Sequence, residues 1–540
     1  MSRDAAAPGQ KKLLRGVLVL MPAALFSKVV GMFYKIPLLF IVGVEGMAYF
    51  LAAYHVYSLL FVLCATGLPT ALALQISRAL ARGEVRAVGR IFRASLLLFL
   101  LLGLVGSACL LFFAEPLAVR LSMGDAAAAL AAIAPSIALS AFIGVGKGYF
   151  QGHSRMGPIA LCEVLEAAGK LCFGLGFALW AKKQGLATPA VAAYAVYGIT
   201  AGMALSALSL LPTLALSLRR GRGVPTGVLP GYRRVLGELC RVGLPITLGA
   251  AVMSAISLLD TALISARLQS AGFPANLANA MYSSYGNLAI PLYNLVPALL
   301  APVTLSLMPL LGGAVTGKDA ASARAALYSA VRISALVGIP ASLGLCVFAR
   351  PLLSLIFAGQ SEAIAFAAPL LSVLALAVLP AVLISVLGGA LQATGHALLP
   401  VLATGVGAAV KLLCESALLT VPGVYLLGAP ISTLACVMTV LLIEWAALCR
   451  VLPFPALAPR DLFRPLLASL PALLLGVGLY QLLRLRAGES GLLMLPVLLA
   501  VGGSMLFFAL FFGAVEKEDL LTLPAGDRIC TFLEKCKLLK

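Results

Sequence analysis

The sequence predicts an all-α polytopic membrane protein, and this class follows from composition, apolar segments and loop charge. Of its 540 residues, 62% are hydrophobic types and only 11% are charged, whereas an ordinary soluble domain is about 25% charged. A soluble fold would have nowhere to place this apolar surface, because its exterior must face water. The composition therefore excludes a soluble enzyme, a disordered protein and a nucleic-acid-binding protein, so no nucleic-acid partner is expected.

About fourteen apolar segments are long enough to cross a bilayer, which takes about 20 residues for a helix. The chain lacks the short alternating strands of a barrel, and lipid leaves only helices to satisfy the backbone. The predicted spans are 15–41, 47–77, 92–114, 126–150, 158–181, 189–218, 242–268, 278–311, 325–349, 363–391, 399–421, 425–449, 465–483 and 490–514.

Basic residues concentrate on one side of these spans. With the N-terminus inside, the inside segments hold 28 of the 39 Lys and Arg residues and the outside loops hold 7. Because cytoplasmic loops carry the excess of positive charge, we expect both termini in the cytoplasm and an even number of spans.

The segment after the sixth span, residues 219–241, is basic and rich in Gly and Pro. We interpret it as a cytoplasmic linker between an N-terminal six-helix lobe, 1–218, and a C-terminal six-helix lobe, 242–452. Two extra spans then occupy 453–514, and 515–540 is a cytoplasmic tail.

An internal repeat supports two pseudo-symmetric lobes. Without gaps, residues 151–171 align with 392–412, so that Lys170 meets Lys411. These segments are the fifth and eleventh spans and start on the same side, which predicts a parallel repeat. Transporters commonly use such repeats and bind substrate between them.

Span one carries two lysines at bilayer depth, Lys28 and Lys35. An ionisable group there costs roughly 2.5–3.5 kcal/mol on insertion scales, so it normally faces a cavity or a partner. Seven residues are nearly two helical turns, which places both lysines on one face, where they repel unless an anion is near. A lipid-linked pyrophosphate would suit, and we interpret both as substrate-binding. The alternative is that they reach the interface.

Two further groups of charges lie inside predicted spans. Glu166 and Lys170 in span five, and Lys411 and Glu415 in span eleven, are four residues apart and can pair within their own helices. Such pairs form part of a cavity or merely stabilise the bundle, and the sequence leaves both readings open. Glu163 is left over as an unmatched acid in span five.

Span seven carries Asp260, whose own helix has no basic residue before Arg267. A carboxylate at this depth either pairs with a lysine from another helix or binds a cation or proton. Lys28 or Lys35 is the expected partner, since spans one and seven are equivalent in the two lobes. We place Glu444, in span twelve, at the cytoplasmic interface.

Helix breakers interrupt two equivalent spans, at Gly67 and Pro69 in span two and at Pro291 and Pro297 in span eight. Proline frees carbonyls that must be satisfied by protein or water. We interpret these positions as gating breaks for alternating access, with simple packing kinks as the alternative.

The segment Gly312–Asp319 reads GGAVTGKD and resembles a phosphate-binding loop, but Asp319 stands where that motif needs Ser or Thr. We therefore expect no nucleotide site, no cofactor, no metal site and no catalytic residues. Transport energy must come from a gradient or the membrane potential, and coupling to Na⁺ or H⁺ stays open.

Several segments in order resemble the stage V sporulation protein B family, within the multidrug/oligosaccharidyl-lipid/polysaccharide (MOP) exporter superfamily, which includes MurJ-type lipid II flippases. They are 27–38, 43–46, 57–60, 66–70, 148–152, 259–261 and 517–524. The resemblance implies two six-helix lobes, a central cationic cavity, alternating access and a groove formed by the two extra helices for a polyprenyl tail. Lys28 and Lys35 take the cationic span-one positions of the flippases, where Arg is usual.

The resemblance implies a flippase that moves an undecaprenyl-pyrophosphate-linked glycan, lipid II or a related precursor, across the bacterial cytoplasmic membrane. Its expected partners are the lipid-linked oligosaccharide, membrane lipids and cell-wall synthesis enzymes. The alternatives are a drug/cation antiporter of the same superfamily and a non-transporting scaffold for cell-wall or sporulation enzymes.

Overall fold

The computed structural model describes residues 8–220, 231–316, 319–452, 459–488 and 490–514, and all regular elements within these ranges are helices. The predicted tail 515–540, part of the predicted linker, and residues 453–458 lie outside the described residues. The chain forms two compact units: unit 1 comprises 1–269 and 273–283, and unit 2 comprises 270–272 and 284–540.

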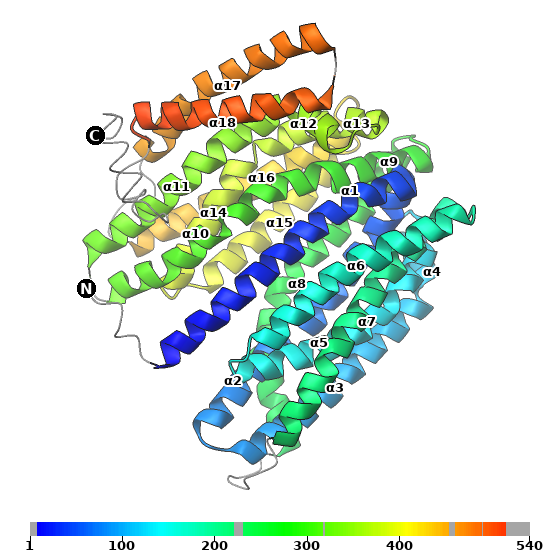
Figure 1. Ribbon diagram of the computed structural model, residues 1–540, viewed down its shortest axis with the longest axis vertical. Coiled ribbons are helices and arrows are strands. Elements are labelled where there is room, and N and C mark those ends of the chain that lie inside the picture. Colours follow the sequence, from blue (N-terminus) through cyan, green and yellow to red (C-terminus); the bar gives the residue numbers. More distant parts are fainter. Residues whose placement is uncertain (1–7, 221–230, 317–318, 453–458, 489, 515–540) are drawn as a thin grey trace. The chain divides into compact units, whose positions relative to one another are not determined.

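Unit 1 is built from long helices that pack side by side (Figure 1). They are α1 (Pro8–Ala65), α2 (Gly67–Ala81), α3 (Val85–Phe112), α4 (Ala114–Arg120), α5 (Ala127–Gly152), α6 (Gly157–Lys183), α7 (Thr188–Arg220), α8 (Tyr232–Ser270) and α9 (Ala275–Ser284).

Unit 2 begins with a π-helical segment, η2 (Tyr285–Ala289). Its α-helices are α10 (Ile290–Thr316), α11 (Ala320–Val347), α12 (Ala349–Ile356), α13 (Ser361–Ala375), α14 (Val378–Ala393), α15 (Leu398–Leu418), α16 (Gly428–Val451), α17 (Pro459–Ala487) and α18 (Met494–Phe511). The helices α17 and α18, the two predicted extra spans, lie side by side (Figure 1), and Leu336 of α11 packs against their shared core.

The prediction of an all-helical membrane protein is confirmed. Among the described residues, 11 helical segments are long and apolar enough to cross a membrane, or up to 12 if the bent pair α13–α14 forms one span. The predicted count of about fourteen is not confirmed. The predicted spans 15–41 and 47–77 fall within α1 and α2, which follow each other with a break at Gly43 and another at residue 66, and 278–311 is divided between α9, η2 and α10.

The stretch of α1 folds back on itself at Gly43, whose φ of 80° and ψ of 170° lie outside the helical region. Tyr34 and Phe50 are sixteen residues apart, which is about 24 Å in a straight helix, yet their ring centroids lie 6.1 Å apart. Glycine tolerates these angles because it has no Cβ. The break falls between the two predicted spans, and it brings the two arms of α1 together.

The helix α8 belongs to unit 1, although the predicted lobe boundary at 219–241 assigns it to the second lobe. The reason is close packing onto the start of α2 and the second arm of α1. A Cβ on Gly67 would collide with the backbone of Gly243 and Thr247. Further along α8, the Thr261 hydroxyl lies 2.7 Å from Nδ1 of His55 on the second arm of α1.

Asp319 has a structural role in the segment that resembles a phosphate-binding loop. Its carboxylate accepts a hydrogen bond of 3.0 Å from the backbone N–H of Ser322 and thereby caps the N-terminus of α11. Hydrogen bonds from Ser322 lower the pKa of the Asp319 carboxyl. An acidic N-cap of this kind satisfies a backbone donor that the first helical turn leaves unpaired.

Candidate functional site

A cavity of about 290 Å³ lies within unit 1. It is enclosed by both arms of α1 together with α5, α6 and α7. The polar and charged residues on its wall are Ser27, Tyr34, Lys35, Tyr54, Lys147, Glu163, Glu166 and Lys170. The volume is at the lower end for ligand sites, which are about 300–1,000 Å³.

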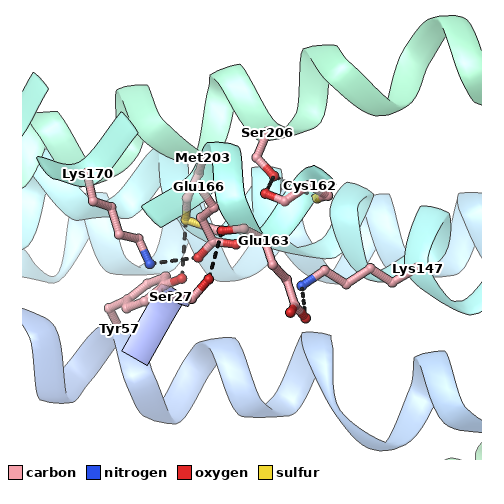
Figure 2. A network of polar contacts seen from close by, with 9 residues as sticks. All are labelled: Ser27, Tyr57, Lys147, Cys162, Glu163, Glu166, Lys170, Met203 and Ser206. Carbon is pink, nitrogen blue, oxygen red and sulfur yellow. Dashed lines mark hydrogen bonds and ion pairs between the residues drawn. The ribbon is translucent and has the colours of Figure 1, made fainter. Parts of the chain in front are cut away.

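Two ion pairs hold the α6 side of this cavity (Figure 2). Lys170 Nζ lies 2.6 Å from Glu166 Oε1, so the structure contains the i,i+4 pair that the sequence allows. Lys147 Nζ of α5 lies 3.4 Å from Glu163 Oε1. Glu163 is therefore not an unmatched acid, which corrects the sequence interpretation. Sequence reasoning missed Lys147 because its partner is on another helix, although its place inside the apolar span 126–150 was a signal.

The first arm of α1 is fixed against α6 at the level of these pairs. The Ser27 hydroxyl donates a hydrogen bond of 3.0 Å to the backbone carbonyl of Glu163 (Figure 2). Two helical turns further along, Lys35 also lines the cavity. No carboxylate lies within 4 Å of Lys35 among the described residues. The wall thus carries three lysines and two glutamates, and both glutamates already have a lysine partner.

Lys28 lies on the same arm of α1, next to Ser27, but its side chain is outside the described part of the structure.

The second arm of α1 contributes a run of aromatic rings to the cavity. The Phe50 and Tyr54 rings are stacked, with centroids 6.3 Å apart and an interplanar angle of 9°. Tyr57 and Phe61 continue the run, with ring centroids 5.4 Å apart. Of these rings, Phe50, Tyr54 and Phe61 line the cavity. The site thus combines a cationic side with a flat apolar side.

Asp260 does not pair with Lys35, one of its two expected partners, in the described structure, and the side chain of the other, Lys28, lies outside the described residues. The second arm of α1 explains why. Tyr54 faces the cavity, whereas His55, turned by about 100° on the helix, contacts Thr261 of α8. The α8 residues next to Asp260 therefore pack on a different face of this arm from the one that borders Lys35.

Unit 2 contains the other predicted ion pair, in α15. Lys411 Nζ lies 3.7 Å from Glu415 Oε2, and the side chains are only 8% and 0% exposed. Glu444, expected at the interface, is instead 1% exposed on α16. The carboxyl group lies beside Gly388 of α14, where it occupies the space of the absent side chain.

Two of the four predicted breaks lie at helix boundaries, Gly67 at the start of α2 and Pro291 at the start of α10, beside the π-helical segment η2. Gly67 begins α2 directly after α1 ends, and a Cβ on Gly148 of α5 would lie 2.8 Å from the Pro69 carbonyl oxygen. One residue separates Pro291 from the end of the π-helical segment η2, and Pro297 lies within α10. π-Helical turns are rare and frequently occur at functional sites. The short distance between Gly148 and Pro69 places the break at Pro69 against α5, the helix that carries Lys147.

Comparisons with known proteins agree with this architecture. A family model described as polysaccharide biosynthesis protein matches residues 13–315, more than half of the chain, and a MatE model matches 245–414. The chain is 25% identical over 532 residues to the uncharacterized membrane protein YabM of Bacillus subtilis (strain 168), covering 96% of each. It is also 25% identical to stage V sporulation protein B of that organism, covering 82% of this chain and 85% of the relative.

A similar fold is found in a solved structure of the lipid II flippase MurJ in an inward closed conformation. The TM-score is 0.68 at 16% identity, covering 92% of this chain and 98% of that one. This likeness shows a shared fold over most of both chains. The chain belongs to the polysaccharide biosynthesis protein family, within the MOP superfamily of membrane transporters.

Proposed function

We propose that this transporter is a flippase that moves an undecaprenyl-pyrophosphate-linked glycan from the inner to the outer leaflet by alternating access. The observation that carries the proposal is the surplus positive charge on the cavity wall of unit 1. Lys147 and Lys170 are neutralised by glutamates, whereas Lys35 lines the cavity with no carboxylate within 4 Å among the described residues. An anionic group is the partner that such a site requires.

The same charges argue against a drug/cation antiporter, the reading that a MatE match alone would favour. A cationic drug would use the aromatic rings Phe50 and Tyr54 together with a carboxylate. Both carboxylates on the wall, however, are held by lysines at 2.6 and 3.4 Å. A cation would have to break an ion pair and lie beside Lys35, which makes the cavity unfavourable for it.

Size defines what part of the cargo this cavity holds. A volume of about 290 Å³ accommodates a pyrophosphate or a single sugar ring, not a whole glycan with its lipid. We therefore assign the pyrophosphate to Lys35 and Lys28 and the first sugar to the aromatic side. The name of a relative with this fold, lipid II flippase, supports a cargo of this class.

The remaining predicted residues receive roles in the cycle. We assign the ion pairs of Glu163, Glu166 and Lys170 to the cavity wall of unit 1. Lys411 and Glu415 form the corresponding ion pair in unit 2. Asp260 tunes the cycle from α8. The breaks at Gly67, Pro69, Pro291 and Pro297 allow helices to bend during the cycle. The protein lies in the cytoplasmic membrane with both termini in the cytoplasm.

The decisive experiment measures outer-leaflet lipid II in cells depleted of their own flippase and expressing this chain. We expect rescue by the parent chain and loss of rescue by Lys35→Ala, with equal amounts of protein in the membrane. Lys183→Ala is the matched control, because Lys183 is an exposed lysine at the end of α6. Full rescue by Lys35→Ala would remove Lys35 from cargo binding.

Binding to the purified protein separates cargo recognition from transport. With inorganic pyrophosphate as the probe, Lys35→Ala should weaken binding about 10- to 100-fold, the range for one lost charged hydrogen bond. Lys35→Arg should retain binding, and Lys183→Ala should not change it. If the parent binds pyrophosphate but does not rescue lipid II, the cargo is another lipid-linked glycan.

A further inference from the structure

Glu444 is a carboxylic acid in an apolar place. It lies on α16 with 1% of its surface exposed. A Cβ on Gly388 of α14 would lie 3.2 and 3.4 Å from its two carboxyl oxygens. Leu387, Leu391 and Leu448, neighbours in sequence of Gly388 and Glu444, belong to a hydrophobic core cluster of unit 2. The acid is thus enclosed where α14 and α16 meet.

No cation or hydrogen-bond donor compensates this carboxyl within the described residues. Glu444 takes part in none of the ion pairs or hydrogen bonds of the described structure, and its Oε2 atom is buried without a partner. Thr304 of α10 lies against Gly389, the neighbour of Gly388. Its hydroxyl oxygen is also buried without a hydrogen-bond partner. An isolated ionised carboxylate costs several kcal/mol in such surroundings, and a group in this position takes up a proton instead.

The charged groups on the helices around α16 do not reach Glu444. The helix α15 runs antiparallel to α16, with Gly407 opposite Cys436 and Val440 and with Leu418 opposite Gly428. This register places Lys411 about 13 Å from Glu444 along the helix axis, and Lys411 is paired with Glu415.

None of the other titratable groups of these elements forms an ion pair or hydrogen bond with Glu444 in the described structure, and this includes the buried Arg332 and Asp461. The helix α14 has no charged residue, and Glu362 is exposed in the first turn of α13. Arg450 is exposed at the end of α16 itself. Two of these elements, α11 and α17, contribute to the same core cluster. The remaining titratable side chains on α15, α16, η3, α11 and α17 are Cys414, Cys436, Cys449, Tyr425, Arg324, Tyr328, Arg332, Cys346, Arg460, Asp461, Arg464, Tyr480, Arg484 and Arg486.

We propose that Glu444 is a proton-binding site of unit 2, and that transport is coupled to protons through it. The carboxyl group holds its proton while α14 covers it. When the contact between α14 and α16 opens to water, the O–H bond breaks, the proton passes to a water molecule and a carboxylate remains. A metal ion would need several oxygen ligands, and no group of three acidic, His or Cys side chains converges in the described part of the chain.

Trp445 provides a direct probe, because it follows Glu444 on α16 and the chain has only 2 tryptophans. In a Trp180→Phe background, Trp445 is the only tryptophan. Its fluorescence is measured in lipid nanodiscs over roughly pH 5 to 9, the range in which a buried glutamate titrates. We expect a single sigmoidal change, which Glu444→Gln abolishes. Gln has nearly the same shape and is always neutral, so it mimics the protonated acid.

Glu362→Gln is the matched control, since it removes an exposed glutamate from the same unit. It should leave the titration unchanged. A flat titration in the Trp180→Phe protein, or a titration that persists in Glu444→Gln, would overturn the proposal. Thermal unfolding of both variants shows whether the fold is retained, and Glu444→Asp, which keeps a carboxyl group, should restore a sigmoidal change.

The coupling part of this inference rests on the proposed function, whereas proton binding does not. A proton gradient is imposed on vesicles that contain the protein and lipid II, and the flipping rate is compared with that at equal pH. The gradient should accelerate the parent and Glu362→Gln but not Glu444→Gln. An accelerated Glu444→Gln would refute coupling through this residue. A Trp445 titration in a protein that moves no lipid II would refute only the cargo.

Discussion

The helix pairs α6–α7 and α15–α16 occupy equivalent places in the predicted repeat, and the lysine that each pair carries at the matching position has a differently placed partner. The alignment that matches Lys170 with Lys411 places a glutamate four residues before the lysine in unit 1 and four residues after it in unit 2. Both glutamates pair with their lysine, at 2.6 Å for Glu166 and 3.7 Å for Glu415. The two units therefore keep the cation and reverse the position of its partner.

Glycines explain the reversal. The alignment sets Glu166 opposite Gly407, and its extension by three residues sets Glu415 opposite Gly174. A side chain at Gly407 would meet the Cys436 carbonyl oxygen of α16 at 3.1 Å, and one at Gly174 would meet the Tyr34 ring at 2.9 Å. Small residues allow helices in membranes to approach closely. In each pair, the turn on one side of the lysine is used for helix packing, so the carboxylate occupies the other side.

The surroundings of the two pairs also differ. Lys170 and Glu166 are 25% and 14% exposed and border the cavity, whereas Lys411 and Glu415 are 8% and 0% exposed. A cavity-facing pair can exchange its partner for cargo, whereas a sealed pair mainly keeps two charges compensated. The difference fits the proposed cargo binding in unit 1, whereas the pair in unit 2 is enclosed and compensated.

The largest expected effect is on the sealed pair. Lys411→Leu leaves Glu415 buried without its cation and should lower the free energy of unfolding by about 3–5 kcal/mol. Lys170→Leu should cost less, about 1–3 kcal/mol, because Glu166 borders a cavity. Thermal unfolding in detergent compares the two variants. The double variant Lys411→Leu/Glu415→Leu should recover most of the loss, and equal losses at the two lysines would remove the distinction between the pairs.

The packing glycines give the next largest effect. Gly174→Ala should destabilise unit 1 by about 1–3 kcal/mol, because the new methyl group meets the Tyr34 ring. Gly176 lies on the same helix with nothing within 4 Å of an added Cβ. Gly176→Ala should therefore be neutral or stabilising by up to about 1 kcal/mol. Similar unfolding temperatures for the two variants would contradict the packing explanation.

The fold-back at Gly43 tests how the open site of unit 1 is assembled. Gly43→Ala has space for its methyl group but not the backbone angles, so we expect a loss of about 1–2 kcal/mol. Because the fold-back brings Lys35 to Phe50 and Tyr54, pyrophosphate binding should weaken too. Gly31→Ala, at a helical position with open space around it, should cause no destabilisation. Unchanged stability and binding in Gly43→Ala would show that the fold-back does not depend on glycine.

The smallest effect concerns the helices α3 and α11, which are equivalent in the predicted repeat. Asp319 caps α11 through its side chain, whereas Glu84 at the start of α3 makes no such bond. Asp319→Ala should lower stability slightly at neutral pH, and Glu84→Ala should not. Because the pKa of Asp319 is lowered in the folded state, its contribution is present above the usual carboxyl pKa and disappears as the pH falls through the lowered value. Unfolding at neutral and acidic pH measures this, and a pH-independent difference would argue against the cap.

The sequence by itself determined the helical membrane class and the contacts that lie within one helix. Apolar segments must be helical in lipid, and a spacing of four residues places Glu166 beside Lys170 and Lys411 beside Glu415 whatever the remaining chain does. The turn near Gly43 was also evident, since the apolar pattern stops between 41 and 47.

Only the tertiary structure decided the contacts between helices. Lys147 and Glu163 meet because α5 and α6 pack in one particular register. Lys35 is separated from Asp260 because α1 folds back and turns different faces of its second arm to the cavity and to α8. Glu444 is enclosed rather than interfacial because α14 covers it with a glycine. Depth along a helix can be read from sequence, but the face that a neighbour covers depends on packing angles and register, which residues distant in the chain determine together.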